Sequence, residues 1–236
     1  MFPDGDYGRT VIATDRVPER LPRGRHGLPR RFIVHNQRER MLLAVAEAVA
    51  EQGYATTTVA DIIARARLSR RTFYEHFADK EECYLAAYDT VVEQLLGAVG
   101  QAYEQAEGWT QKVHDGLETF LAYLAAEPAF ARMCIVEVVA AGPEARSRRD
   151  AAMRVFVEFL EPGRAEAPRG VVVPALASEI VVGGIYEIIY SRLQRDAAGE
   201  LVEMLPELLN CALIPYVGHV AAQRAVATAR ERAGAA

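Results

Sequence analysis

The residues best suited to chemistry in this sequence lie in the run SRRTFYEHFADKEE, residues 69–82. The run holds two arginines, three aromatic residues, a histidine and one of the two lysines of the chain. Because successive residues of a helix are turned by about 100°, Phe73 and Phe77 share one side and Arg71 and Glu75 lie opposite. The run therefore predicts a helix with a buried aromatic side and an exposed polar face.

Side chains on and beside this polar face have the chemistry needed to contact nucleic acid. Those expected to hydrogen-bond the edges of bases are Arg70, Arg71, Thr72 and Glu75. Tyr74 and His76 flank them and can hydrogen-bond phosphate oxygens. Lys80 opens the next helix, where its charge and the helix dipole both favour a nearby phosphate. The alternative is an ordinary solvated face on which the cations pair with the glutamates of the same run.

Two short helices are expected to hold this face in place. Thr58 and Asp61 have the spacing of a capping box at the start of the first, and Ser69 is the expected N-cap of the second. Only three residues separate them, so they must cross steeply, as in a helix-turn-helix. The helix before them is expected to begin at Asn36, with Glu39 completing a capping box.

The remainder of the chain predicts longer helices and an all-α fold, because apolar residues recur three and four apart and no long stretch alternates with period two. The expected helices are near 80–106, 109–126, 128–140, 143–161, 174–196 and 200–222. Residues 1–34, with four prolines and scattered arginines, predict a flexible basic arm. Residues 35–80 then form a helix-turn-helix domain and residues 81–236 a helical domain, whose tail from Arg224 is expected to fray.

Charge is unevenly distributed along the chain. Residues 20–80 hold twelve Lys and Arg against six Asp and Glu, whereas residues 81–236 hold thirteen against twenty-two. A basic first third suggests a polyanionic partner, although chance asymmetry between solvated faces is the alternative.

Several function classes are disfavoured by what the sequence lacks. It has no Gly-rich phosphate loop, no HExxH, no GxSxG and no cysteine–histidine metal spacing, so neither enzyme chemistry, a metal nor a cofactor is expected. The most apolar segment carries Pro174, Glu179 and Glu187, so it is not expected to span a membrane. The protein is expected to be cytoplasmic. Cys83, Cys134 and Cys211 are expected to be reduced, buried thiols, with redox sensing by Cys134 as a minor alternative.

Residues 36–90 resemble the DNA-binding segment of the TetR family of transcriptional regulators. The resemblance rests on Gly-Tyr after the first helix, Thr before Val-x-Asp-Ile, and Ser-x-x-Thr-Phe-Tyr-x-His-Phe-x-x-Lys. It implies a homodimer, most simply a repressor, whose paired recognition helices enter successive major grooves of a palindromic operator. It also implies that Thr58 adds a phosphate contact. An activator of the same family and a helical adaptor for a protein partner are the alternatives.

The resemblance gives the second domain two tasks, dimerisation and effector binding. The last two long helices, 174–196 and 200–222, carry apolar stripes suited to a four-helix interface, or to completing the core of one chain. A mostly apolar pocket for a small-molecule effector is expected from Trp109, Phe120, Tyr123, Phe130, Met133, Phe156 and Tyr186. His114 is as suited to the surface as to the ligand.

Two further expectations concern the DNA-binding segment. Arg67 stands in the turn where family members often have glycine; a positive φ there would cost about 1 kcal/mol, and a slightly adjusted turn is expected instead. The arginines of LPRGRHGLPRR, residues 21–31, either follow DNA or belong to a solvated linker.

Overall fold

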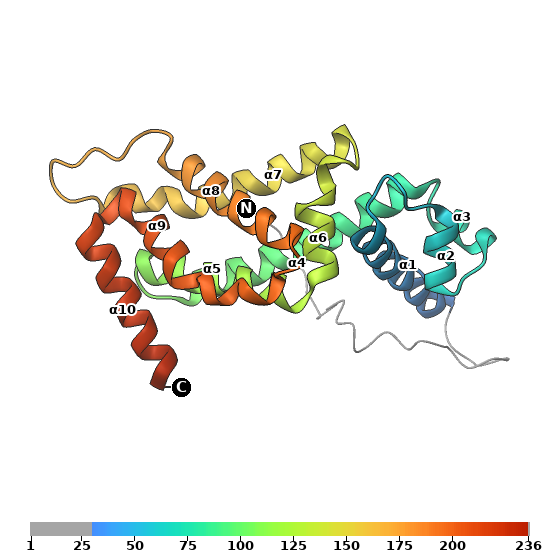
Figure 1. Cartoon of the computed structure of the whole chain (residues 1–236), viewed down its shortest axis with the longest axis horizontal. Coiled ribbons are helices and arrows are strands. Elements are labelled where there is room, and N and C mark those ends of the chain that lie inside the picture. Colours follow the sequence, from blue (N-terminus) through green and yellow to red (C-terminus); the bar gives the residue numbers. More distant parts are fainter. Residues whose placement is uncertain (1–29, 236) are drawn as a thin grey trace. The chain divides into compact units, whose positions relative to one another are not determined.

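The computed structural model describes residues 30–235, and within this range the chain is built of helices with no β-strand. The all-α prediction is therefore confirmed for the described part of the chain. The α-helices, shown in order along the chain in Figure 1, are α1 (Arg30–Gln52), α2 (Val59–Ala66), α3 (Arg70–His76), α4 (Lys80–Gln105), α5 (Trp109–Ala126), α6 (Pro128–Ile135), α7 (Pro143–Leu160), α8 (Ala177–Gln194), α9 (Leu205–Val217) and α10 (His219–Ala235). Short 3-10 helices add η1 (Glu137–Val139), η2 (Glu161–Glu166), η3 (Ala198–Glu200) and η4 (Val202–Met204).

The chain forms two compact units, residues 1–94 and residues 95–236. In the described part of the first unit, apolar side chains of α1, α2, α3 and the start of α4 are buried together. Val45, Ile62 and Phe73 are fully buried, and Phe77 is nearly so. The prediction that Phe73 and Phe77 hold the polar-faced helix to a small core is thus confirmed.

The beginning of α1 differs from the prediction. The helix starts at Arg30, so Asn36 and Glu39 lie inside it and form no capping box. Both side chains are largely buried, at 6% and 7% exposure. A polar pair with capping-box spacing inside a longer helix explains the error, since spacing alone does not show where a helix starts. The predicted arm before residue 30 lies outside the described residues.

An apolar cluster joins several helices of the second unit. It is contributed by the end of α4, by α5 and by α7 to α10, and its most buried members include Leu213, Tyr216 and Ala222. Trp109 at the start of α5 packs edge-on against Tyr216, with ring centroids 5.0 Å apart. Gly163 in η2 lies so close to the indole that a Cβ there would be 2.2 Å from Trp109 Cζ2.

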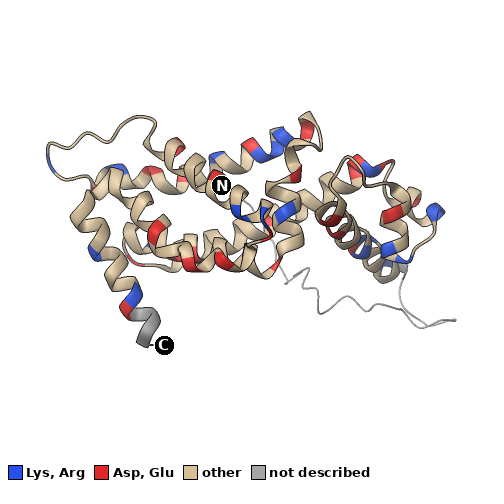
Figure 2. Cartoon of the chain, viewed as in Figure 1, with Lys and Arg blue, Asp and Glu red and all other residues tan. Residues whose placement is uncertain are grey.

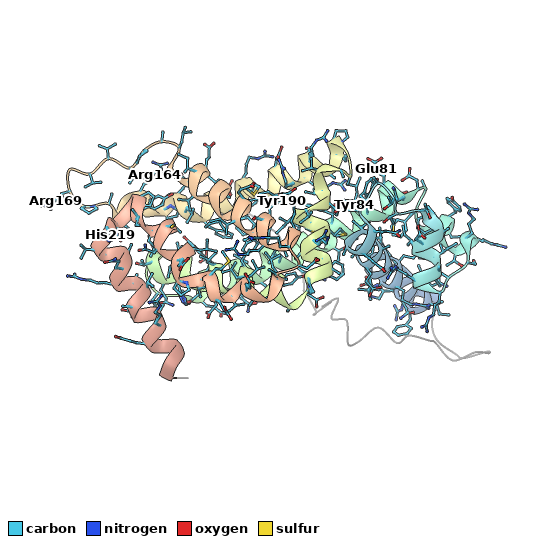
Figure 3. The ribbon with its side chains drawn as sticks, viewed as in Figure 1. Glu81, Tyr84, Arg164, Arg169, Tyr190 and His219 are labelled. Atoms are coloured by element: carbon cyan, nitrogen blue, oxygen red, sulfur yellow. The ribbon has the colours of Figure 1, made fainter. Side chains whose placement is uncertain are left out.

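A polar network fixes the connection from α7 to α8 against this cluster. Arg164 (Figure 3) pairs with Glu161 at 2.6 Å and donates hydrogen bonds to the carbonyl oxygens of residues 173, 174 and 175. Ser178 Oγ donates to Glu161 and lies 2.7 Å from the hydroxyl of Tyr216. Ionic and backbone bonds thus hold the loop even though its apolar residue Val172 is 88% exposed.

The last third of the chain corrects two predicted elements. The helix expected at 200–222 is split into η3, η4, α9 and the start of α10, because Pro206 falls in the first turn of α9 and Gly218 ends that helix with a φ of 79°. The tail expected to fray from Arg224 is helical through Ala235. Ala222 and Val226, four residues apart, are buried in the apolar cluster, and this packing accounts for the order.

Two smaller corrections concern helix ends and cysteines. The helix expected at 128–140 changes to a 3-10 turn after Ile135, and the one expected at 174–196 begins only at Ala177. Cys83 and Cys134 are buried as predicted, but Cys211 is exposed. Burial raises the pKa of the Cys83 thiol to about 12, so this group stays protonated at neutral pH.

Candidate functional site

The candidate nucleic-acid interface is built on the α2–turn–α3 segment of the first unit. Helix α2 starts as predicted: Thr58 is its N-cap, and its side chain and that of Asp61 form the reciprocal capping box. Thr58 Oγ1 lies 2.6 Å from Asp61 Oδ2 and also accepts from the backbone N–H of Asp61 at 3.3 Å. Hydrogen bonds to Thr58 lower the pKa of the Asp61 carboxyl group. The hydroxyl expected to meet phosphate is therefore already used in the cap, although its residue is exposed.

The turn between α2 and α3 contains Arg67 in the left-handed region, with φ 51° and ψ 45°. The expectation of an adjusted turn is wrong, because arginine adopts the conformation that usually favours glycine. Arg67 N–H donates to Ala64 O and Leu68 N–H to Ile63 O, at 3.2 and 3.0 Å, which are the bonds of a Schellman motif. The guanidinium group of Arg40, on α1, donates to the carbonyl oxygens of Ala66 and Arg67. These bonds offset the backbone strain and fix the angle at which α3 leaves α2.

Helix α3 begins as predicted at its cap. Ser69 accepts from the backbone N–H of Thr72 at 3.0 Å, and the two hydroxyl groups lie 2.8 Å apart. Phe73 faces inward, and the Tyr74 ring stands edge-on to it, 51% exposed. Arg70, on the first turn of α3, is exposed, and Thr72 is half-buried. Figure 2 shows how the basic and acidic residues are distributed over the helices. The outward arginines, Tyr74 and Glu75 are thus accessible on one short helix.

Two residues of the exposed face are held together by an ion pair. Arg71 Nε donates to Glu75 Oε1 at 3.0 Å, while the two side chains are 89% and 57% exposed. So exposed a pair adds little stability. Its effect is to restrict the rotamers of Arg71, so that the terminal nitrogens of the guanidinium group remain available to an acceptor.

His76 and Lys80 are turned partly inward. His76 Nε2 lies 3.4 Å from Gln37 Oε1 on α1, and burial together with the charge of Arg38 lowers the pKa of the imidazole. Lys80 Nζ donates to the carbonyl oxygen of Tyr54 at 2.8 Å and sits 4.1 Å from the centroid of the Tyr54 ring. Burial lowers the pKa of Lys80.

The sequence interpretation missed the residues that support this site from α1 and from the α1–α2 turn. Arg40, Gln37 and Tyr54 each contact a residue more than twenty positions away in the chain. No local spacing indicates such contacts, because they depend on how the three helices pack. Only the Gly-Tyr pair at residues 53–54 gave any signal, and it was interpreted as the end of a helix.

The seven residues expected to form an effector pocket fall into three sets in the second unit. Trp109 belongs to the apolar cluster described above, and Phe156 packs against it. Phe120 contacts the Phe156 ring, with centroids 4.9 Å apart. Phe130 and Met133 are buried on α6. The two tyrosines form the third set. The Tyr186 hydroxyl donates to Ile135 O at 2.8 Å. Burial raises the pKa of the Tyr123 hydroxyl.

His114 lies in a small polar cluster on α5. Its Nδ1 lies 2.7 Å from Asp115 Oδ1, which also accepts from Gln111 Nε2 at 2.5 Å. Its side chain is 13% exposed and is therefore not an ordinary surface histidine.

Known proteins resemble the chain in both sequence and fold. A family model for bacterial regulatory proteins of the tetR family matches residues 42–87. The HTH-type transcriptional activator FasR of Mycolicibacterium smegmatis is 28% identical over 110 residues, which are 47% of this chain and 50% of that protein. The transcriptional regulator AcuR of Cereibacter sphaeroides is 34% identical over 84 residues, 34% of this chain and 37% of that protein. The chain thus covers half or less of the length of these curated relatives.

Solved structures extend the similarity in fold. The fatty acid degradation regulator FadR from Bacillus halodurans superposes with a TM-score of 0.68 at 18% identity, covering 75% of this chain and 94% of that one. FadR from Bacillus subtilis, solved in complex with stearoyl-CoA, gives 0.64 at 19% identity, covering 74% and 96%.

Fold and site together define a helix-turn-helix segment followed by a helical second unit, an arrangement also found in solved regulators of transcription. The relatives of the chain are regulators rather than enzymes. The match to the tetR family model is confined to residues 42–87, which hold the helix-turn-helix, and the solved TetR-family structures share the fold. None of the helices between residues 30 and 235 combines the length and apolar character needed to cross a bilayer.

Proposed function

We propose that the protein is a homodimeric, sequence-specific DNA-binding regulator whose operator affinity is controlled by a small-molecule effector. The observation that carries the DNA-binding part is the exposed face of α3, where Arg71 is 89% exposed and Tyr74 51%. Arginine in a major groove can donate two hydrogen bonds to guanine, and a tyrosine hydroxyl can bond phosphate. Chromosomal DNA as the partner would place the protein in the cytoplasm.

The proposed contacts divide by accessibility. Arg70, Arg71 and Glu75 are exposed and are proposed to face bases, with Thr72 at their edge. Tyr74 is proposed to bond phosphate. Thr58 and His76 can reach phosphate only by sharing or leaving their present hydrogen bonds, so we assign them weaker contacts.

The test is selection of bound sequences from random DNA, followed by affinity measurement on the selected site. Arg71→Ala combined with Tyr74→Ala is expected to abolish specific binding. Arg169→Ala, which removes an exposed charge from the loop before α8, is the matched control and should bind as the wild type does. Survival of specific binding in the double variant would refute the assignment of α3.

Dimerisation is proposed through the outward face of α8, with α9 beside it. The apolar residues expected from the sequence to form the interface fall into a buried set and an exposed set. Leu205, Leu209 and Leu213 of α9 are buried within one chain, as are Val181 and Ile189 of α8. Exposed side chains of α8 remain: Ile180 is 67% and Ile188 39% exposed, and Gly183 and Gly184 have no neighbour within 4 Å of a Cβ. Apolar side chains around two small residues suit close approach by an identical helix.

For the effector we propose a ligand with a long apolar chain, and acyl-CoA is the first candidate to test. Support comes from the aromatic series Phe120, Phe156, Phe159 and Tyr103, whose neighbouring ring centroids lie 4.9–6.3 Å apart. FadR of Bacillus subtilis, which has this fold, was solved with stearoyl-CoA. Trp109 is the only tryptophan of the chain, so its fluorescence reports on this unit alone. Saturable quenching by stearoyl-CoA but not by coenzyme A is expected, and no change with either would refute this choice.

We propose repression as the mode of regulation, with release from DNA when the effector binds. Activation is the second candidate, favoured by the similarity to the activator FasR. A reporter gene placed behind the selected site separates them: repression predicts that expression rises when the protein is removed, and activation predicts that it falls.

A further inference from the structure

The indole N–H of Trp109 is a buried donor without an acceptor. Trp109 opens α5 and is 6% exposed, and its Nε1 has no hydrogen-bond partner in the part of the chain that the structure describes. A buried donor that lacks a partner is costly, and folded proteins leave few of them. The position therefore points to an acceptor that binds there.

The indole has little room to turn toward an acceptor of its own chain, because its ring is held on two sides. The Tyr216 ring of α9 packs against it at a centroid distance of 5.0 Å and an interplanar angle of 61°. On the side of η2, a Cβ at Gly163 would lie 2.2 Å from Trp109 Cζ2 and 2.6 Å from Cε2, the carbon bonded to Nε1. Since α9 and η2 fix the ring, they also fix the direction of its N–H bond.

The hydroxyl groups near the indole use their own protons within the chain. Ser178 Oγ donates to Glu161, so the tyrosine hydroxyl is the donor in the 2.7 Å contact between Ser178 and Tyr216. Of these three donors, the N–H of Trp109 is the one that is left for a ligand.

The charges in this region favour a neutral acceptor over a carboxylate. Arg164 pairs with Glu161 at 2.6 Å, and Lys112, in the first turn of α5, pairs with Glu104 at 3.6 Å. A carboxylate buried beside the indole would have to compete with a glutamate for either cation, and burying an unpaired charge is costly. A carbonyl group carries no charge and is satisfied by a neutral donor.

A row of apolar side chains leads away from Trp109 along one face of α5. Val113, Leu117 and Phe120 follow Trp109 at helical spacing, so all four lie on the same side of the helix. Phe120 lies about 16 Å further along the helix axis, and Phe156 of α7 packs against its ring. Leu117, Phe120 and Phe156 are only partly buried. A long apolar chain lying along this row would bring its polar end to the indole.

We propose that Trp109 determines the specificity of the effector site, and that its indole N–H donates a hydrogen bond to the acyl carbonyl of a long-chain thioester. The inference rests on the proposed function, in which acyl-CoA is the effector. The acyl chain follows the apolar row of α5. The neutral thioester is preferred to the free fatty acid, because the carboxylate of the acid would be buried without a cation of its own.

The single tryptophan of the chain gives one indole N–H resonance, which reports on this bond directly. In NMR spectra of the isotope-labelled full-length protein, stearoyl-CoA should move the indole proton downfield and slow its exchange with deuterium. Octadecyl-CoA, a thioether with a methylene group in place of the carbonyl, should bind without either change, and stearate should also produce neither. Saturable binding of stearoyl-CoA with an unchanged indole resonance would overturn the proposal, as would equal changes with the thioether or with stearate.

Calorimetry with two proteins and two ligands tests the same bond by affinity. The wild type should bind stearoyl-CoA about tenfold more tightly than octadecyl-CoA. Trp109→Phe keeps an aromatic ring beside Tyr216 and removes the donor, so it should bind the two ligands equally. A tenfold preference that persists in Trp109→Phe, even with weaker binding of both ligands, would show that the ring only packs and would overturn the proposal.

The control for this comparison is Tyr103→Phe. It removes a hydroxyl group that already donates to Phe159 O at 3.0 Å, so it should keep the preference of the wild type for stearoyl-CoA. Loss of that preference in Tyr103→Phe as well would count against a specific role of Trp109. Should Trp109→Phe not fold, the indole resonance of the wild type decides the question.

Failure of this inference and failure of the proposed function give different results. If neither stearoyl-CoA, octadecyl-CoA nor stearate binds the wild type, the acyl effector is refuted together with the carbonyl contact. If stearoyl-CoA binds and the indole resonance does not respond, the acyl effector stands and only the role of Trp109 is refuted.

Discussion

Arg67 has a backbone conformation that is unfavourable for its residue type. It adopts a left-handed conformation that side chains with a Cβ disfavour by about 1–2 kcal/mol, and it keeps that conformation because backbone bonds and Arg40 hold the turn. The same bonds that fix the turn also fix the direction of α3. The strain therefore lies where the direction of α3, the helix proposed to contact DNA, is decided.

We expect Arg67→Gly to stabilise the protein by about 1 kcal/mol, because glycine adopts positive φ without the Cβ penalty. Arg67→Ala keeps the penalty and is the control; it should gain nothing. Urea unfolding followed by circular dichroism measures both. Equal effects of the two substitutions would show that the turn carries no such strain.

His76 predicts a dependence of stability on pH. Burial and Arg38 lower the pKa of its imidazole below that of the unfolded chain, despite the opposing charge of Glu75. As pH falls below about 6.5 the unfolded state therefore binds the proton more readily, and the folded state loses stability. Above pH 7 the histidine is neutral in both states and contributes no slope.

The comparison is between the wild type and His76→Gln, which has no titrating group. The difference in unfolding free energy between them is expected to be constant from pH 8 to 7 and to turn against the wild type between pH 6.5 and 5. A parallel pH profile for the two proteins would contradict the inward placement of the imidazole.

At the scale of elements, the most specific packing contact is that of η2 with the start of α5. Gly163→Ala would place a methyl group 2.2 Å from Trp109 Cζ2, so the indole or η2 must move. Overpacking of this kind costs about 1–3 kcal/mol. Gly97→Ala is the matched control, since Gly97 lies in α4 with open space around it, and alanine there should stabilise the helix by about 0.5–1 kcal/mol. Thermal unfolding and the emission maximum of Trp109 would record both, and a neutral Gly163→Ala would refute the contact.

Local signals in the sequence were sufficient to predict α2 and α3, although not the start of α1 or the turn at Arg67. The Thr58–Asp61 capping box, the Ser69 N-cap and the spacing of Phe73 and Phe77 all appear as predicted. Each depends on neighbours within four residues, and helix periodicity describes such neighbours well.

Contacts between residues far apart in the sequence could not be predicted from such local patterns. Lys80 was interpreted from its charge and its place at a helix start, yet its nearest acceptor is a carbonyl 26 positions earlier. Likewise α10 is ordered by burial of Ala222 and Val226, whereas the composition of its sequence suggested fraying. Packing decided both cases, and packing depends on the whole fold.

At the scale of the whole molecule, the exposed row on α8 predicts the oligomeric state. We expect the wild-type protein to be a dimer by light scattering, and Ile180→Glu with Ile188→Glu to shift it to monomer, because four charges would be buried at a two-fold interface. Val172→Glu, on the 88% exposed residue of the preceding loop, is the control and should remain dimeric. A dimeric double variant would place the interface elsewhere.

The central claim is that α3 reads DNA sequence. Its most direct test measures the affinity of the wild type, of Arg71→Ala and of Glu75→Gln for the selected site and for single-base variants of it. The account predicts that Arg71→Ala lowers affinity by about 1–3 kcal/mol and loses discrimination at one base pair, while Glu75→Gln weakens that discrimination by freeing Arg71. Equal affinity of wild type and Arg71→Ala for every variant of the site would contradict the account.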